Sequence, residues 1–175
     1  NSGDWDLSRH GKYSGVDMTH TDQESGEKYV PYIVETSDGA DRAALMFLID
    51  AYTEMETRSG DEDAKHEKEV VLKLHKDLAP IKVAILPLSK KEPLQKLAKE
   101  IQSGIWGDLM TQYDETGSIG KRYRRQDEIG TPYCVTVDFE SLEDKKVTVR
   151  DRDTMEQERI SIEDLKNHLK EKFNR

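Results

Sequence analysis

Cysteine is almost absent from this chain of 175 residues, and its scarcity limits both the chemistry and the compartment. A single cysteine, Cys134, cannot close an internal disulfide, which fits a reducing compartment. Long apolar runs are also absent, because the longest are the length of one strand and far too short to span a membrane. No secretory signal is recognisable. We therefore expect a cytoplasmic protein with no membrane partner.

The chain also lacks a surplus of positive charge. Its net charge is -9, which argues against a general nucleic-acid binder, since such proteins usually present a basic surface. Binding through one local basic patch stays open, because the field near a protein is set by local clusters. Hydrophobic residues make up 34% and charged residues 36%, so a core requires the apolar residues to be concentrated in regular elements.

Signatures of metal and nucleophile chemistry are missing as well. The five histidines lack the spacing of metal ligands, and Cys134 has no partner at such spacing, so we expect no metal site. No local signature of a Ser/His/Asp or Cys/His site is present. Cys134 lies inside a predicted strand and is interpreted as a small core residue. The histidines are His10, His20, His66, His75 and His168.

An acidic stretch of mixed charge divides the chain at residues 57–69 (TRSGDEDAKHEKE). It shows no apolar periodicity and contains a Ser-Gly pair, which indicates a surface linker. An exposed helix is the alternative for its second half. Before it, residues 29–35 (YVPYIVE) predict a strand, 36–40 a turn and 41–55 a helix, because apolar residues recur there at helical spacing.

After the linker, strands alternate with helices. Residues 81–88 (IKVAILPL) form an almost continuous apolar run, typical of a strand buried on both faces. The pattern predicts an α/β fold, in which helices cover a mixed sheet. Further strands are predicted at 70–74, 109–113, 131–139, 146–150 and 155–160, and helices at 93–105 and 119–129, with a last helix that begins at a capping box formed by Ser161 and Asp164.

The first candidate site is the segment from Glu35 to Arg42 (ETSDGADR), where the predicted strand meets the helix. Gly39 permits a tight turn or the close approach of a ligand. The first turn of the helix offers free N–H groups and a positive dipole end to an anion, and Arg42 can fork onto phosphate oxygens. Glu35 can hold an ammonium group. The alternative is an ordinary capped helix start, with Arg42 paired to an acid.

The second candidate site is the basic cluster Lys121, Arg122, Tyr123, Arg124 and Arg125, which stands out in an acidic chain. Neutralising phosphate and stacking on bases require these types of side chain. The alternative is a solvated helix face, whose charge the following acidic residues, Asp127 and Glu128, partly offset.

Three segments resemble the glycyl-tRNA synthetases of the dimeric α2, class II type. Residues 74–84 (LHKDLAPIKVA) resemble the entry to their anticodon-binding domain, and residues 114–138 and 147–157 continue the similarity. The resemblance covers nearly the whole chain and is weakest in the linker. It implies a class IIa anticodon-binding domain at 70–175. It also implies that residues 1–56 contain the last strand and helix of an antiparallel α+β class II catalytic domain.

The resemblance also implies roles for the first candidate site. Residues 39–42 resemble class II motif 3, whose arginine contacts the γ-phosphate of ATP. The resemblance implies no catalytic residue apart from those that bind the substrates. The implied ligands and partners are glycine, ATP with Mg²⁺, the tRNA for glycine and a second copy of the chain in a homodimer. The implied glycine-binding residues are Glu35, Thr36, Ser37, Asp38 and Gly39, and the implied ATP-binding residues are Gly39, Ala40, Asp41 and Arg42.

Two positions depart from the family pattern. Thr36 stands where the family commonly has proline, and Ser2 where it commonly has arginine. The change at Ser2 means either that a substrate contact is lost or that the first residues are distorted.

Two functional hypotheses follow. The first is a glycine–tRNA ligase that works through glycyl-adenylate; because class II motifs 1 and 2 are absent, we expect this chain alone not to form the adenylate. The second is a non-catalytic, synthetase-like module that binds RNA or protein.

Overall fold

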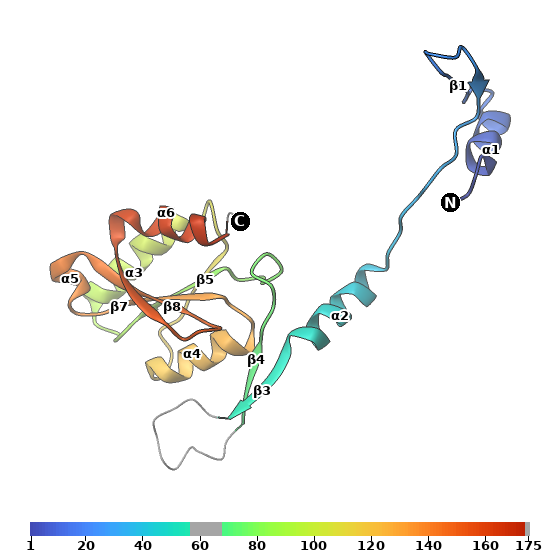
Figure 1. Ribbon diagram of the computed structural model, residues 1–175. Helices are drawn as coiled ribbons and strands as arrows, with labels where there is room; N and C mark the ends of the chain where they lie inside the picture. Colours follow the sequence, from blue (N-terminus) through green and yellow to red (C-terminus); the bar gives the residue numbers. More distant parts are fainter. Residues whose placement is uncertain (57–67, 174–175) are drawn as a thin grey trace. The chain divides into compact units, whose positions relative to one another are not determined.

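The computed structural model describes residues 1–56 and 68–173 of the chain (Figure 1). These residues divide into two compact units, 1–43 and 44–175. No helix in the described part of the chain is both long and apolar enough to cross a bilayer.

The first unit is small and has little core. Its helix α1 (Trp5–Ser14) buries no residue and ends at Gly15, whose left-handed backbone (φ 72°) stops the helix. Strands β1 (His20–Thr21) and β2 (Lys28–Tyr29) pair antiparallel. The strand predicted at 29–35 is mostly wrong: beyond Tyr29 only Ile33 pairs, through an isolated bridge to Gly3. Pro31 explains the break, because proline has no N–H to donate to a ladder. Helix α1 was not predicted.

Helix α2 (Ala40–Ala51) begins in the first unit and ends in the second. The predicted helix 41–55 is therefore too long. From Tyr52 the chain continues as β3 (Tyr52–Glu56), which pairs antiparallel with β4 (Lys68–Leu72) in the register Tyr52 to Leu72. The hydrogen bonds of this hairpin override local helix preference. Two residues of the predicted linker thus belong to β4, and the other eleven, 57–67, lie outside the described residues.

The second unit is built on a mixed five-stranded sheet of order β6-β5-β7-β8-β9. Strand β5 runs parallel to β6 and β7, while β7, β8 and β9 are antiparallel, so the predicted mixed α/β sheet is confirmed. The strands are β5 (Val83–Pro87), β6 (Thr111–Tyr113), β7 (Tyr133–Val137), β8 (Lys146–Asp151) and β9 (Gln157–Ser161). The helices are α3 (Glu92–Ile105), α4 (Ile119–Glu128), α6 (Ile162–Phe173) and the short α5 (Ser141–Asp144), which the sequence did not predict.

The two faces of the sheet are covered differently. Helices α3 and α6 lie on one face, where the larger apolar residues of β5, β7 and β8 pack, and α4 lies on the other (Figure 1). The face under α4 has few buried apolar residues, namely Ala84, Leu86 and Cys134. Because side chains alternate along a strand, β5 is buried on both sides, as predicted. Cys134 is 1% exposed, which confirms it as a core residue, and burial raises the pKa of its thiol to about 12.

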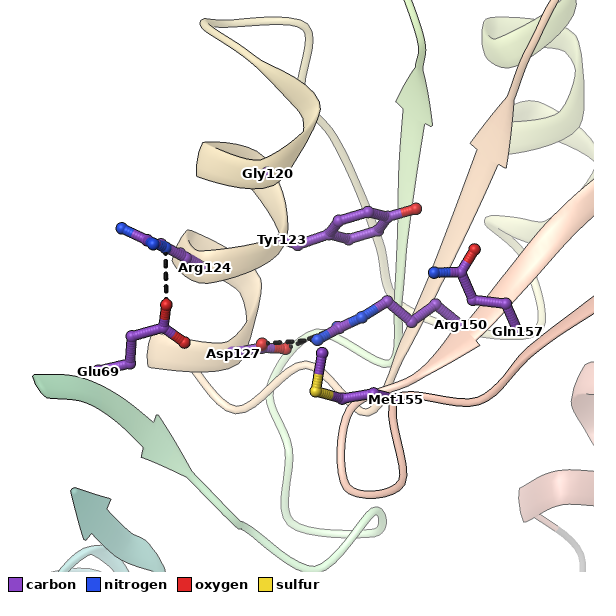
Figure 2. Close-up of a pocket in the computed structure, with 8 residues that line it drawn as sticks. All are labelled: Glu69, Gly120, Tyr123, Arg124, Asp127, Arg150, Met155 and Gln157. Carbon is purple, nitrogen blue, oxygen red and sulfur yellow. Dashed lines mark hydrogen bonds and ion pairs between the residues drawn. The ribbon is translucent and has the colours of Figure 1, made fainter. Parts of the chain in front are cut away.

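A buried ion pair joins α4 to the sheet beneath it (Figure 2). The guanidinium of Arg150 on β8 donates two hydrogen bonds of 2.9 Å to the two carboxylate oxygens of Asp127 on α4. The two side chains are only 4% and 5% exposed. Burial disfavours the charge on Arg150, but the Asp127 carboxylate outweighs it and raises the arginine's pKa. The same guanidinium lies 4.8 Å from the ring centroid of Tyr123.

A second buried arginine fixes the entry to the sheet. Arg152 donates to the backbone carbonyls of Gly130 and Leu74, at 2.8 and 3.0 Å. Gly130 itself has φ 81°, and a Cβ there would lie 3.0 Å from the carbonyl oxygen of Leu72. Only glycine meets both conditions without strain. The end of α4 is therefore held closely against the segment that follows β4.

We expect Asp127→Ala to destabilise the chain by about 3–5 kcal/mol, because it leaves the charge of Arg150 buried without a partner. Urea unfolding at neutral pH measures the change. Glu128→Ala is the matched control: this neighbouring carboxylate on the same helix is exposed, so its loss should change stability by less than about 0.5 kcal/mol. Equal effects of the two substitutions would contradict the role given to the pair.

Candidate nucleic-acid interface

The carboxyl ends of β5, β6 and β7 form an edge at which the topology of the sheet changes. Strand β5 lies between β6 and β7. The chain runs from β5 to β6 on one side of it and then to β7 on the other side. Ligands of open α/β sheets bind at such edges. The segments that line this edge are 88–91 after β5, 114–118 after β6 and 138–140 after β7.

This edge carries exposed apolar surface beside positive charge. Phe139 is 44% exposed and Leu88 is 38% exposed. The ammonium group of Lys91 lies 4.8 Å from the ring centroid of Phe139. Lys90, Lys91 and Lys121 are all exposed, and none forms an ion pair with a residue that the structure describes. An aromatic surface with available cations is the combination that binds unpaired bases and their phosphates.

Two arginines of the predicted basic cluster donate hydrogen bonds to the segments that line the edge. Arg122 is 2% exposed and its guanidinium donates to the carbonyl oxygens of Pro87, Leu88 and Asp114. Arg125 donates to the Asp114 carboxylate and to the carbonyl of Thr116. Arg122 thus joins the end of β5 to the loop after β6, and Arg125 joins the last turn of α4 to the same loop, so the two guanidinium groups position this loop.

The remaining members of the basic cluster point elsewhere. Tyr123 is largely buried: its hydroxyl lies 2.5 Å from Thr136 Oγ1, and burial raises its pKa. Arg124 pairs with Glu69 of β4, with 2.9 Å between Nε and Oε1. Five consecutive residues of a helix point to all its sides, since each is rotated by about 100° from the last. The structure therefore brings only Lys121 to the edge as an exposed cation.

Sequence patterns alone hardly indicate the other edge residues. Lys90 and Lys91 follow the strand predicted at 81–88 after one residue, and Phe139 is the last residue of the strand predicted at 131–139, which is the one signal available. To place them together requires the order of the strands, because residue 139 meets residue 91 only if β7 lies beside β5.

The other predicted site, residues 35–42, lies in an exposed segment that leads into α2. The N–H of Gly39 donates to Asp38 Oδ1 at 2.7 Å, and the Gly39 carbonyl accepts from the N–H of Ala43. Gly39 does not have a left-handed backbone, and a Cβ there would meet the side chain of Arg42 at an ordinary 3.7 Å. The turn therefore does not require glycine at this position, and the close approach of a ligand, the other role considered for Gly39, stays a prediction.

Charge pairs within this segment are scarce. Within the described ranges, 1–56 and 68–173, Arg42 forms no ion pair, so the alternative of an Arg42 paired to an acid gains no support. Among the same residues, no group of three or more His, Cys, Asp or Glu is placed to hold a metal.

One carboxylate at the edge is strongly stabilised in its charged form. Asp138 accepts hydrogen bonds from the guanidinium of Arg159, at 2.7 and 3.2 Å, and from the N–H and hydroxyl of Ser141. The Arg159 contact lowers the pKa of Asp138 to about 2, and burial only partly opposes it. Arg159 also reaches Asp144, so one arginine fixes the turn from β7 into α5.

Comparison with known proteins identifies the family of the second unit. The family model described as "Anticodon binding domain" matches residues 82–172. The solved RNA binding domain of threonyl-tRNA synthetase from Cryptosporidium parvum is similar in structure, with a TM-score of 0.52 and 25% sequence identity. That similarity covers 57% of this chain and 25% of the other.

Curated relatives at higher identity are named glycine–tRNA ligase. The one from Clostridium acetobutylicum is 56% identical over 170 residues, which is 97% of this chain and 35% of the relative. The one from Thermobifida fusca is 49% identical over 173 residues, or 99% of this chain and 37% of the relative. The chain thus spans about a third of the length of the curated relatives it matches, in their C-terminal part.

We expect Asp138→Asn to cost about 1–2 kcal/mol of stability at pH 7. The pKa of Asp138 is lower in the folded chain than its unfolded value near 3.9, so its contribution is complete above about pH 4 and is lost as the pH falls toward 2. The variant should therefore lose less stability than the parent between pH 4 and pH 2. Urea unfolding over this pH range measures both effects.

Glu143→Gln, at an exposed carboxylate on α5, is the control for removing one acidic charge from this region. An identical pH profile for the parent and Asp138→Asn would show that Arg159 does not hold Asp138 as described.

Proposed function

The chain belongs to the anticodon binding domain family, and on this premise we propose that it is the C-terminal part of a glycine–tRNA ligase. Its part in the reaction is to bind the tRNA for glycine at the edge formed by the ends of β5, β6 and β7. The observation that carries the proposal is the exposed Phe139 beside Lys91 at this edge, with Lys90 and Lys121 also exposed.

Binding at the edge would combine two kinds of contact. The three lysines neutralise phosphates, which supplies most of the affinity and makes it depend on salt. Phe139 and Leu88 offer apolar surface to an unpaired base, whose flat face stacks on aromatic rings. The loops need little ordering on binding, because Arg122 and Arg125 already hold them.

For the first unit we propose contacts with the small substrates. The carboxylate of Glu35, with residues 36–39, holds the ammonium group of glycine. Arg42 and the free N–H groups in the first turn of α2 hold the phosphates of ATP. In the proposed reaction the carboxylate of glycine attacks the α-phosphate of ATP, which forms glycyl-adenylate and releases pyrophosphate. A hydroxyl of the terminal ribose of tRNA then attacks the carbonyl carbon of glycyl-adenylate, takes the glycyl group and releases AMP. These residues position and neutralise charge.

The surface of α2 supports the view that this helix belongs to a larger core. Its residues from Leu45 to Ile49 are consecutive and apolar, and each is at least 46% exposed. A helix that is apolar on all sides is stable when it is surrounded by protein. We propose that residues 1–56 are the end of the catalytic domain, 57–69 the linker and 70–175 the anticodon-binding domain. We also propose that the protein is cytoplasmic and that two copies of the full-length protein form a homodimer.

The tRNA proposal predicts a change in both affinity and salt dependence. Replacing Lys90, Lys91 and Lys121 together by alanine should weaken binding of glycine tRNA by roughly tenfold or more. It should also reduce the slope of log affinity against log salt by about 2–3, since each phosphate contact contributes about 0.7–0.9. The matched control replaces Lys73, Lys96 and Lys146, which are also exposed. If both triple variants behave alike, the edge is not the binding surface.

The substrate proposal predicts that Gly39→Ala separates folding from activity. A Cβ fits at this position, so the thermal unfolding of the 175-residue chain should be unchanged. In the full-length ligase the added methyl should lower glycine-dependent pyrophosphate exchange by roughly tenfold, since it blocks the approach of a ligand. The chain alone, lacking motifs 1 and 2, should show no exchange. Full exchange activity in the variant would contradict the site, and tRNA binding by a full-length protein without any exchange would favour a non-catalytic binding module.

A further inference from the structure

A groove of about 310 Å³ lies between α3 and α6, the two helices on the face of the sheet opposite α4 (Figure 1). Its floor is apolar and is formed by Leu97, Ile101 and Ile105 on one stripe of α3 and by Ile162 and Leu165 on α6. Most of these residues are buried in the main core, but Leu97 and Ile162 are only partly covered. This α3–α6 groove therefore presents apolar surface to solvent.

Gly104 keeps the groove open on its α3 side. It lies inside the helix, and no atom is within 4 Å of the position that its Cβ would take. Glycine is among the weakest helix formers. The backbone of Gly104 is not left-handed, so its conformation does not require glycine. The space above it is available to the side chain of a partner.

Negative charge lines the rim of the groove. Glu100 on α3 and Glu163 on α6 are exposed, and neither forms an ion pair with any residue in the two described ranges. Lys166, the cation among the lining residues, is already engaged, because its ammonium group lies 2.5 Å from a carboxylate oxygen of Asp108. The charge left for a partner to match is therefore negative.

The sign of this charge decides which partners fit. It repels the phosphates of RNA, so the groove does not extend the proposed tRNA surface. It also opposes a second copy of this chain, whose net charge is -9 and whose own groove has the same acidic rim. A protein segment that carries both apolar side chains and basic groups satisfies the floor and the rim together.

The shape of the groove favours a helical partner. Helix α3 has 14 residues and α6 has 12, so each is roughly 20 Å long at about 1.5 Å per residue. A third helix packs on two such helices by placing its ridge of side chains in the groove between them. Apolar side chains of the partner at positions i, i+3 or i+4 and i+7 then face the floor. Lysine or arginine beside them meets Glu100 and Glu163.

We propose that the α3–α6 groove is the docking site for a basic amphipathic helix of another protein, which places one large apolar side chain over Gly104. The edge lysines, Lys90, Lys91 and Lys121, do not line the groove. The inference therefore does not rest on the proposed function.

The test selects peptides on the 175-residue chain from a displayed library of random sequences about 14 residues long, the length of α3. Gly104→Leu is the counter-selecting variant. Its side chain begins in open space and favours a helix, so the variant should fold as the parent does and fill the groove. Enriched peptides should carry leucine, isoleucine or phenylalanine at helical spacing and a net positive charge. Labelled with fluorescein, they should bind Gly104→Leu roughly tenfold more weakly, as measured by fluorescence anisotropy.

The role of the rim is tested by replacing Glu100 and Glu163 together with glutamine. The selected peptides should then bind roughly three- to tenfold more weakly, and their affinity should depend less on salt. The matched control replaces Glu128 and Glu156, which are exposed carboxylates that do not line the groove. It should have a smaller effect. Equal effects of the two pairs would show a general attraction of charges and would overturn the site.

Gly120→Leu is the matched control for Gly104→Leu, since Gly120 is also a helical glycine with no atom within 4 Å of its Cβ position, but it lies on α4. It should bind the peptides as the parent does. The proposal is overturned if no peptide prefers the parent to Gly104→Leu, or if the enriched peptides are acidic or lack helical periodicity. The full-length ligase gives the last comparison. If it does not bind peptides that the 175-residue chain binds, the rest of the ligase covers the groove, and docking of another protein is overturned.

Discussion

The hydrogen-bonded pair of Arg150 and Asp127 fixes the position of α4, and most of the candidate RNA surface depends on that helix. The sheet face under α4 offers only Ala84, Leu86 and Cys134 as buried apolar residues, so apolar area alone gives the helix little attachment. A bidentate pair is directional, and it holds when both groups meet at the correct distance and angle. Here it holds α4 in one register against β8.

That register decides the role of each residue in the basic cluster. Arg122 and Arg125 turn toward the ends of β5 and β6 and hold the loops there. Tyr123 turns toward the sheet, and Arg124 toward β4. Lys121 is left exposed at the edge. Most of the basic side chains of this helix therefore make contacts within the fold, and Lys121 is the one member of the cluster that stays available to a ligand.

The sequence predicted the elements whose pattern is governed by local periodicity. Strand β5 is a continuous apolar run, α3 and α6 carry apolar residues at helical spacing, and all three were placed correctly. The pattern failed at Tyr52–Glu56, where pairing with a distant strand overrides helix preference. It also failed to bring Phe139 and Lys91 together, because their contact depends on strand order, which periodicity does not contain. Residues 35–42 stay a prediction, since their proposed partners are substrates.

The loops held by Arg122 and Arg125 have a consequence for the kinetics of binding. A surface that keeps its shape needs no slow rearrangement before a partner is accommodated, so association is limited by encounter and orientation. Lysines around the edge speed that encounter by drawing a polyanion toward an otherwise acidic protein. For the tRNA of the proposed function, discrimination between correct and incorrect partners would then appear in the residence time of the complex, and their rates of arrival would be similar.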